Sequence, residues 1–305
     1  MSSPTHVEAV EPDAAPCPLC GASPDAPRYA KAGSLIYRCP RCDILFVGGA
    51  AEPVRDPTAE YGEQYYSWLD DNPSLARDIK RATFGAWLRL IEQHVTPGKL
   101  LDVGCAFGFL LEEARARGWQ AHGVEISDYA RRIAAEHNAS AVVVKDLAAL
   151  AAHRGSFRAI TCIDVIEHLY DLGTTLRAVH ELLSDDGLLA LCTPNVRSLT
   201  ARLMGRFWFH IKPREHPLLL SPRALQGLLA DVGFTVLDIR RAWKRMTLGY
   251  VASHFAVYRY PLNQVVSPAI HALPRSWQDF TFPLYSGEMF VLARKSTGAP
   301  AAPAR

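Results

Sequence analysis

The sequence lacks any apolar run as long as the roughly 18–20 residues that a membrane-spanning helix needs. It also lacks a strong charge of either sign, because 33 basic and 31 acidic residues leave a formal net charge of +2. Such a balance does not favour nucleic acid as the main partner. The first residues, MSSPTHVEAVEPDAAP, lack the basic and then apolar pattern of a secretory signal. We therefore expect a cytoplasmic protein without a membrane span.

Structural disulfides are not expected in a reducing cytoplasm, so the seven cysteines need another role. Four of them form two CxxC pairs, Cys17 with Cys20 and Cys39 with Cys42. Two such pairs at this spacing match a tetrahedral Zn²⁺ site with four thiolate ligands. A closed site of this kind has no open position, so the zinc is expected to be structural. A pair of redox-active CxxC motifs is the alternative interpretation.

The chain divides into segments by its polarity and by its apolar periodicity. From about residue 99 onward, strand patterns alternate with helix patterns, which predicts a parallel sheet covered by helices on both faces. The insertion before the last strand is unusually long and rich in aromatic residues, which favours a lid or a dimer surface. The expected segments are a disordered tail (1–16), a zinc ribbon (17–50), a connector and N-terminal helix (51–95), the α/β domain (96–242), the insertion (243–287), the last strand (288–296) and a second disordered tail (297–305).

The strongest chemical signal is the segment LLDVGCAFGFLL at 100–111. A buried strand carries Asp102 near its end, and Gly104 and Gly108 follow before a helix begins. Glycines there let the backbone approach a ligand closely, at the edge of the sheet where α/β proteins bind ligands. The spacing differs from the GxGxxG motif that cradles a pyrophosphate. Glu125 ends the next strand, where an acid can bind both hydroxyls of a ribose, and Asp146 ends the third, within reach of an adenine amino group. A simple tight turn is the alternative.

These residues resemble the class I S-adenosylmethionine (SAM)-dependent methyltransferases, in which a DxGxGxG loop and a strand-end acid form the cofactor pocket. The resemblance covers about residues 80–240 plus the last strand, and the middle glycine of the family motif falls on Ala106. It implies a Rossmann-like α/β fold with a seven-stranded, mostly parallel sheet and helices on both faces, in addition to the zinc ribbon. It also implies a set of cofactor-binding residues, namely Asp102, Gly104, Cys105, Gly108, Glu125, Asp146, Leu147 and Asp164.

The segment ITCIDVIEHLYD at 160–171 resembles the ubiquinone-type and natural-product or sugar methyltransferases. Methyl transfer needs an aligned nucleophile that can lose its proton, and histidine suits that task near neutral pH. His168 is our first candidate for the base and His216 the second. In the resembling enzymes this turn can hold a divalent metal, so Mg²⁺ bound by Asp164, Glu167 and His168 is a second interpretation. A capping or packing role for His168 is the third.

The function expected from the sequence is SAM-dependent methyl transfer to a small molecule. The acceptor atom is expected to be a hydroxyl oxygen of a sugar, a quinone-like compound or a secondary metabolite. An RNA methyltransferase that holds RNA with its ribbon is one alternative, and an inactive zinc-ribbon binding protein is another. Phe207, Trp208 and Phe209 are expected either to line an apolar substrate wall or to be core residues. A homodimer is compatible with the sequence.

Overall fold

The computed structural model describes residues 15–48, 61–69, 73–257 and 263–296. The two expected tails, 1–16 and 297–305, therefore lie outside the described residues except for positions 15 and 16, and the first part of the connector also lies outside them. Among the helices in these ranges, none combines the length and the apolar character that crossing a membrane requires.

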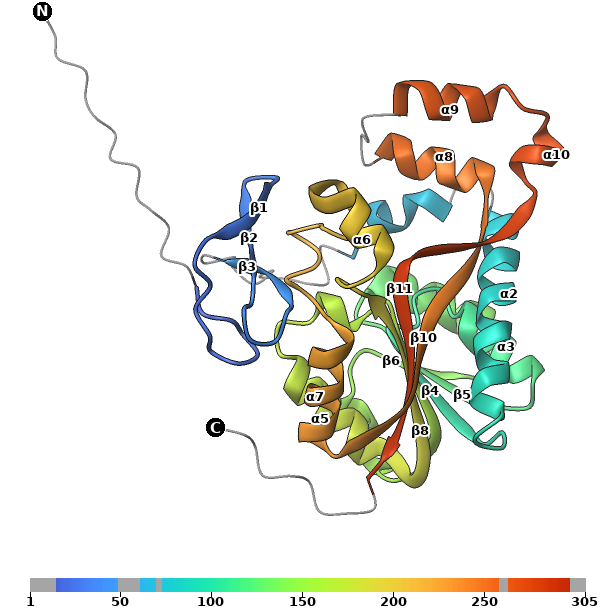
Figure 1. Ribbon diagram of the computed structural model, residues 1–305. Coiled ribbons are helices and arrows are strands. Elements are labelled where there is room, and N and C mark those ends of the chain that lie inside the picture. The colour runs from blue at the N-terminus through green and yellow to red at the C-terminus, as the bar shows by residue number, and fades with distance from the viewer. Residues whose placement is uncertain (1–14, 49–60, 70–72, 258–262, 297–305) are drawn as a thin grey trace, which may run out of the picture.

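A seven-stranded sheet forms the centre of the molecule (Figure 1). Its strands are β4 (Lys99–Val103), β5 (Gln120–Val124), β6 (Val142–Val144), β7 (Phe157–Ile163), β8 (Leu183–Pro194), β10 (Phe234–Thr247) and β11 (Thr281–Lys295). They lie in the order β10-β11-β8-β7-β4-β5-β6, and only β11 runs antiparallel to its neighbours. The expected seven-stranded, mostly parallel sheet is confirmed.

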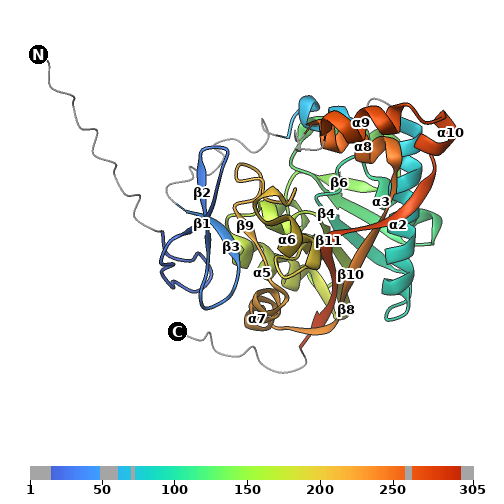
Figure 2. The same cartoon turned by 45° about the horizontal axis from the view of Figure 1, so that its top comes forward.

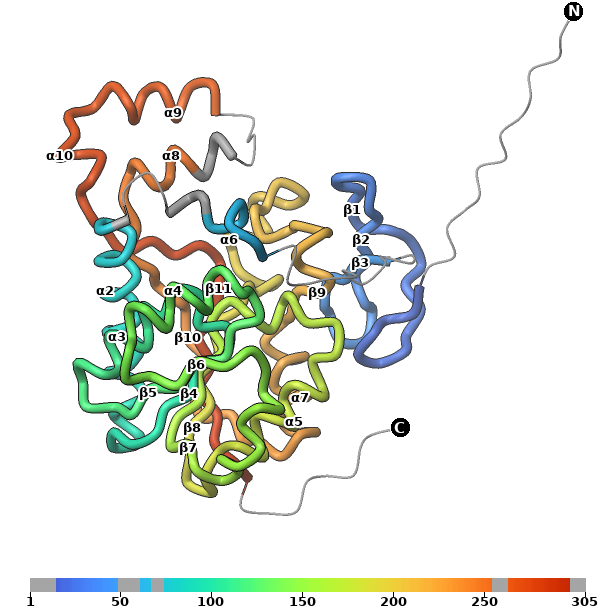
Figure 3. Tube along the Cα trace, turned by 180° about the vertical axis from the view of Figure 1, so that it is seen from behind, coloured from blue at the N-terminus to red at the C-terminus, as the bar shows by residue number. Residues whose placement is uncertain are grey.

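Helices cover both faces of this sheet. Successive residues of a strand point to opposite faces, and in the buried strands both sets are apolar, so each face must be covered. These helices are α2 (Pro73–Glu92), α3 (Phe109–Ala116), α4 (Asp128–His137), α5 (Leu172–Leu182) and α7 (Pro222–Val232). Leu101 of β4 belongs to the core layer that includes side chains of α5 and α7, and Leu100 to the layer that includes side chains of α2 and α3. Figure 3 shows β4, β5 and β6 from behind, with α3 and α4 beside them.

Short elements connect the strands and helices near the carboxyl ends of the parallel strands. Such short turns keep their side chains close to the strand ends, and this is the edge of the sheet where α/β proteins bind ligands. They are η1 (Glu63–Leu69), η2 (Ala148–His153), η3 (Ile166–His168), α6 (Leu199–Met204) and η4 (Gly205–Phe207).

The expected insertion at 243–287 differs from the structure at both of its ends. Strand β10 continues to Thr247 and β11 already begins at Thr281, because the two pair as a long hairpin in which Trp243 lies opposite Tyr285. The hairpin extends beyond the rest of the sheet, and three helices join its two strands (Figures 1 and 2). These helices are α8 (Leu248–Val257), α9 (Asn263–His271) and α10 (Arg275–Gln278).

The N-terminal ribbon is not a separate module. Its strands β1 (Pro27–Lys31), β2 (Ser34–Arg38) and β3 (Leu45–Gly48) pair antiparallel, and a fourth strand, β9 (Leu218–Leu219), pairs with β3. Side chains of the ribbon, among them Tyr37 and Phe46, belong to the same buried cluster as residues of α5 and α7. The expected boundary at residue 50 therefore does not separate two independent cores.

Candidate functional site

The glycines of the loop after β4 adopt backbone conformations that other residues rarely adopt. Gly104 and Gly108 both adopt left-handed conformations, with φ of 72° and 78°. A Cβ atom on Gly104 would lie 2.5 Å from Val165 Cγ2, and one on Gly108 would lie 2.5 Å from Asn138 Nδ2. Both positions therefore require glycine for conformational and for steric reasons. Helix α3 starts directly after Gly108, so its first amide groups lie beside the loop.

Glu125 lies against this loop and holds it in place. One carboxylate oxygen accepts a hydrogen bond from the Ala106 amide (2.8 Å), and the other accepts one from the Ser127 amide (2.9 Å). Ala106 has a φ of 46°, so the residue that replaces the middle glycine of the motif keeps a conformation that glycine adopts more easily. Burial raises the pKa of Glu125, while the Ser127 and Ala106 amides oppose that shift.

The other acids expected near the cofactor lie in different surroundings. Asp102 is buried in β4, where it accepts a hydrogen bond from the Thr161 hydroxyl (2.6 Å), and burial raises its pKa to about 7. Asp146 is exposed and lies beyond the end of β6, where its side chain accepts a hydrogen bond from the Ala149 amide. Because β5 pairs with β6, the segment that carries Asp146 follows the strand next to Glu125.

Aromatic residues of the connector cover the loop, a feature that the sequence did not indicate. Tyr66 in η1 is buried, and its ring lies 4.9 Å from that of Phe107, measured between ring centroids. Burial raises the pKa of Tyr66, and the charge of Glu125 raises it further. The connector therefore forms one wall of the region around the loop.

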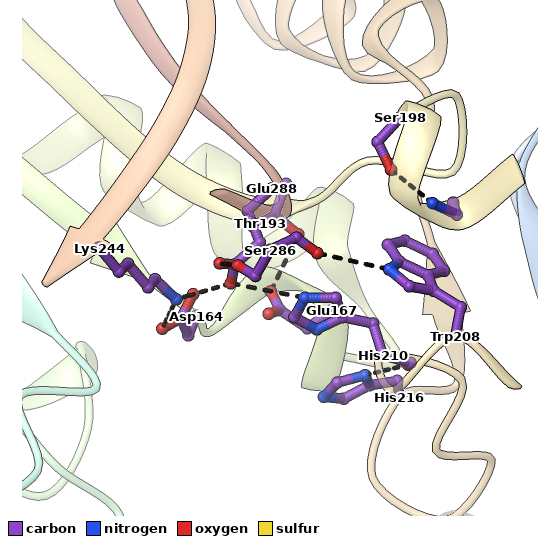
Figure 4. Close-up of polar contacts among 11 residues, drawn as sticks. Asp164, Glu167, Thr193, Ser198, Trp208, His210, His216, Lys244, Ser286 and Glu288 are labelled. Atoms are coloured by element: carbon purple, nitrogen blue, oxygen red, sulfur yellow. Dashed lines mark hydrogen bonds and ion pairs between the residues drawn. The ribbon is translucent and has the colours of Figure 1, made fainter. Parts of the chain in front are cut away.

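An ion cluster lies at the end of β7 (Figure 4). The Lys244 ammonium contacts both oxygens of Asp164 (2.9 and 2.7 Å) and the Oε1 atom of Glu288 (2.6 Å). Burial works against the charge of Lys244, yet the two carboxylates hold its pKa well above the usual value. Sequence reasoning missed Lys244 and Glu288, which lie 80 and 124 positions after Asp164 and reach it only through the β10–β11 hairpin.

The turn after this cluster brings the two candidate histidines together. The rings of His168 and His216 lie 4.6 Å apart, and Tyr61 shares a hydrogen bond with Nδ1 of His168 (3.1 Å). The carbonyl of His210 can only accept, so the 2.7 Å contact shows that Nδ1 of His216 carries the hydrogen. When this ring is neutral, its Nε2 atom is therefore an acceptor. Burial lowers the pKa of His168 to about 4 and that of His216 well below its usual value.

The expected metal ligands do not converge as a set of three. Asp164 is bound to Lys244, whereas ligand atoms of Glu167, His168 and His216 lie within 4.8 Å of one another. Glu167 is buried and accepts a hydrogen bond from Thr193, and burial raises its pKa to about 8. One carboxylate and two imidazoles suit transition metals better than Mg²⁺, which prefers oxygen ligands. The geometry therefore does not fit the expected Mg²⁺ site.

The segment before His216 is core in part. Trp208 is fully buried, and its indole N–H donates to the Ser286 carbonyl (3.5 Å). Phe207 is 47% exposed, and Phe209 packs at the edge of the cluster around Trp208. His210 lies between this cluster and the ion cluster, with its Nε2 atom 3.9 Å from Glu288.

The four N-terminal cysteines converge. Their sulfur atoms lie within 4.8 Å of one another, and three of the Sγ–Sγ distances are 3.4, 3.5 and 3.8 Å. A tetrahedron with Zn–S bonds of about 2.3 Å has edges of about 3.8 Å, so these positions fit a zinc ion. Burial alone would raise the pKa of Cys39, but hydrogen bonds from Cys42 lower it to about 7.

Comparison with known proteins agrees with this geometry. A family model described as a methyltransferase domain matches residues 75–239, more than half of the chain. A ubiquinone biosynthesis O-methyltransferase of Chromobacterium violaceum is 29% identical over 162 residues, which is 48% of this chain and 69% of that protein. A protein of the same name from Pseudomonas aeruginosa is 29% identical over 153 residues, covering 46% of this chain and 66% of its own length. The chain thus spans about two thirds of the length of these curated relatives.

Among solved structures, a SAM-dependent methyltransferase from Archaeoglobus fulgidus has the same fold. The superposition has a TM-score of 0.52 and covers 76% of this chain and 100% of that one, at 17% sequence identity. At this identity the likeness concerns the fold alone.

Proposed function

Because this chain belongs to the methyltransferase domain family, we propose that it binds SAM and transfers the methyl group to a hydroxyl oxygen of a small molecule. The observation that carries the proposal is the pairing of Glu125 with the glycine loop at the carboxyl ends of two adjacent parallel strands. A carboxylate at this edge of the sheet can accept hydrogen bonds from ribose hydroxyls. The relatives named for ubiquinone biosynthesis support an oxygen acceptor.

In this proposal the residues that would hold the cofactor follow the carboxyl ends of β4, β5, β6 and β7. The backbone of Gly104, Cys105 and Gly108 would contact its methionine and ribose parts, and Glu125 would accept hydrogen bonds from the ribose. Asp146 and Leu147, which follow β6, would be on the adenine side. Asp102 supports the loop from within the sheet, since its carboxylate is bonded to Thr161. Asp164 would contact the methionine part of the cofactor with a carboxylate that is also paired with Lys244.

SAM supplies an activated methyl group, so the protein's task is to align the acceptor and to take its proton. Both histidines are neutral at pH 7 because burial lowers the pKa of each. Each neutral ring has one nitrogen lone pair, and that of His216 is on Nε2 because its Nδ1–H is bonded to the His210 carbonyl. In this proposal His168 or His216 takes the acceptor's hydroxyl proton, with burial making both rings weaker bases than an exposed histidine. His168 stays the first candidate, as the sequence suggested, and the Tyr61 hydroxyl shares a hydrogen bond with its Nδ1 atom.

The zinc ribbon has a structural role in this proposal. Cys17, Cys20, Cys39 and Cys42 supply four thiolates, which fill the coordination sphere of Zn²⁺ and leave no position for a substrate. We further propose that the protein works in the cytoplasm on a metabolite, with no nucleic-acid partner. A homodimer stays a prediction from the sequence.

Calorimetric titration with SAM, or with its demethylated product, tests the proposal. The wild-type protein should bind both ligands. A Glu125→Gln variant should bind them about 10- to 100-fold more weakly, because one charge-assisted acceptor of the ribose is lost. Glu136→Gln is a matched control, since Glu136 forms an exposed pair with Arg132 on α4. Thermal unfolding without ligand shows whether each variant is folded. Absence of heat with the wild-type protein would overturn the proposal.

A further inference from the structure

A cavity of about 480 Å³ lies between α6 and the β10–β11 hairpin, outside the loop that we assign to the cofactor. We call it the α6 groove. Figure 2 shows α6 beside β11. The volume is within the range of about 300–1,000 Å³ that is usual for small-molecule sites. The function proposed above assigns no ligand to this groove.

One side of the α6 groove is apolar. Leu199, Leu203 and Met204 of α6 lie opposite Ile239 of β10 and Met289 of β11. Leu199 is 61% exposed and Leu203 is 78% exposed, which is unusual for leucines that lie next to each other on one short helix. A ligand with an apolar body would remove these side chains from water.

The other side of the α6 groove carries positive charge. Arg197 and Arg240 line it, and each has an acidic partner outside the lining, Asp43 (3.4 Å) and Asp238 respectively. Arg241 is different, because it stacks over the Tyr285 ring at 5.4 Å and has no ion-pair partner among the residues that the structure describes.

The acid in the lining does not cancel the charge of Arg241. Glu288 is 2% exposed, and its carboxylate is bound to the Lys244 ammonium. Among the described residues, Arg241 is therefore the one arginine of the α6 groove without an ion-pair partner, and it lies beside an apolar wall.

The α6 groove also adjoins the proposed site of methyl transfer. Asn195 in its lining follows the end of β8, two residues after Thr193, whose hydroxyl donates to Glu167. Glu288 connects the lining to Lys244 and Asp164 at the end of β7 (Figure 4). A molecule in the groove would therefore have one end near the turn that carries His168.

We propose that the α6 groove binds an acceptor with an apolar body and an anionic group, a carboxylate, sulfonate or phosphate, and that Arg241 holds the anionic group. This inference rests on the proposed function only where it identifies the ligand as the methyl acceptor. Binding of the ligand to the groove does not itself require SAM. The guanidinium suits such anions, since it can donate two parallel hydrogen bonds to them. Neutral molecules of the same shape should bind more weakly.

Two dyes that differ in one group test this proposal on the full-length protein. Anilinonaphthalene sulfonate is an anionic, apolar molecule, and phenylnaphthylamine has the same rings without the sulfonate. Fluorescence titration should give one saturable site for the sulfonate dye, with an affinity about tenfold higher than for the neutral dye. In Arg241→Gln this preference should disappear, while the neutral dye should bind as it does to the wild type. Leu203→Ser should weaken the binding of both dyes.

Arg202→Gln is the matched control, because Arg202 is an exposed arginine of α6 outside the lining and should leave both titrations unchanged. Equal affinity for the two dyes, or an unchanged preference in Arg241→Gln, would overturn the proposal. A SAM titration of the wild-type protein separates the two inferences. If the wild type binds SAM but shows no preference for the anionic dye, the groove alone is refuted. If the wild type prefers the anionic dye but does not bind SAM, the proposed function alone is refuted.

Discussion

Two non-glycine residues with left-handed backbones lie at the candidate site, Ala106 with a φ of 46° and Asp164 with a φ of 56°. Such conformations cost free energy and persist where surrounding contacts fix them. Ala106 is fixed by the hydrogen bond from its amide to Glu125, and Asp164 by its ion pair with Lys244. The strain therefore coincides with the two places where a cofactor would contact the ends of β4 and β7.

At the same scale, His168 should make stability depend on pH. Its pKa is about 4 in the folded protein, against about 6.5 for an exposed histidine. Between these values the unfolded chain binds a proton that the folded chain does not, so the free energy of unfolding falls as the pH drops from 6.5 to 4. The contribution of His168 should be up to about 3 kcal/mol, and His168→Gln should remove it. Urea unfolding at several pH values measures this difference.

The comparison between variant and wild type is needed because other buried groups act in the opposite direction. Burial raises the pKa of Glu167 to about 8 and that of Asp102 to about 7, so their contributions to stability decrease as the pH rises. Substitution of the exposed His137 by Gln is the control. An identical pH response in His168→Gln and wild type would contradict the burial of a neutral His168.

At the scale of elements, the β10–β11 hairpin does more than close the edge of the sheet. Its two strands place Lys244 and Glu288 at the carboxyl end of β7, and Arg245 donates its amide to Thr83 of α2. Lys244 lies in the stretch that the sequence suggested to be an insertion. The hairpin thus brings the charge of Lys244 to the site from a segment that the sequence analysis assigned to an insertion outside the α/β domain.

Replacing Lys244 by Met should destabilise the protein by about 2–4 kcal/mol, because Glu288 is buried and would lose its counter-charge. The estimate is moderate because the Asp164 side chain is 33% exposed and water can compensate it. Adding Glu288→Gln should recover part of the loss, since one uncompensated charge is removed. Urea denaturation of the single and double variants measures both effects.

Lys295→Met on β11 is the matched control for this prediction. Lys295 lies 3.7 Å from Asp185, a fully exposed acid, so its pair should contribute no more than about 1 kcal/mol. A Lys244→Met variant no less stable than Lys295→Met would show that the ion cluster does not hold the hairpin in place.

At the scale of the whole molecule, the ribbon and the α/β domain share structure. The Val47 amide donates to the Pro217 carbonyl, and Ser221 donates its hydroxyl hydrogen to the Cys42 carbonyl. His216 directly precedes Pro217, so one of the candidate bases is attached to a strand that pairs with the ribbon. The second CxxC pair therefore helps to fix the segment that carries His216.

Removal of the proposed zinc by a chelator should affect residues far from the cysteines in sequence. Without the metal, the turn that precedes β3 would lose its anchor at Cys39 and Cys42, and the pairing of β3 with the two-residue strand β9 should weaken. Hydrogen exchange measured by mass spectrometry should become faster in peptides that contain β3 and in those that contain residues 216–221. Peptides from β4 and β5 should keep their protection. Unchanged exchange at 216–221 would show that the metal does not stabilise the segment that carries His216.

Features that depend on local pattern could be predicted from the sequence. Alternating strands and helices predicted a parallel sheet covered by helices, because apolar periodicity reports local conformation, and the resemblance to the methyltransferases implied its seven strands. The glycine spacing predicted the open loop, since Gly104 and Gly108 have backbones that few other residues adopt. The CxxC pairs predicted the convergence of four sulfur atoms, because each pair places two ligands in one tight turn.

The contacts between distant side chains became known only from the fold. The contacts of Lys244 with Asp164, of β9 with β3 and of Tyr66 with Phe107 join residues that are separated by 80 positions, by more than 170 and by 41. No local pattern encodes such pairs, because they follow from strand register and from the packing of whole elements. The expected metal site of Asp164, Glu167 and His168 was wrong for the same reason, because Lys244 of β10 forms an ion pair with the Asp164 carboxylate.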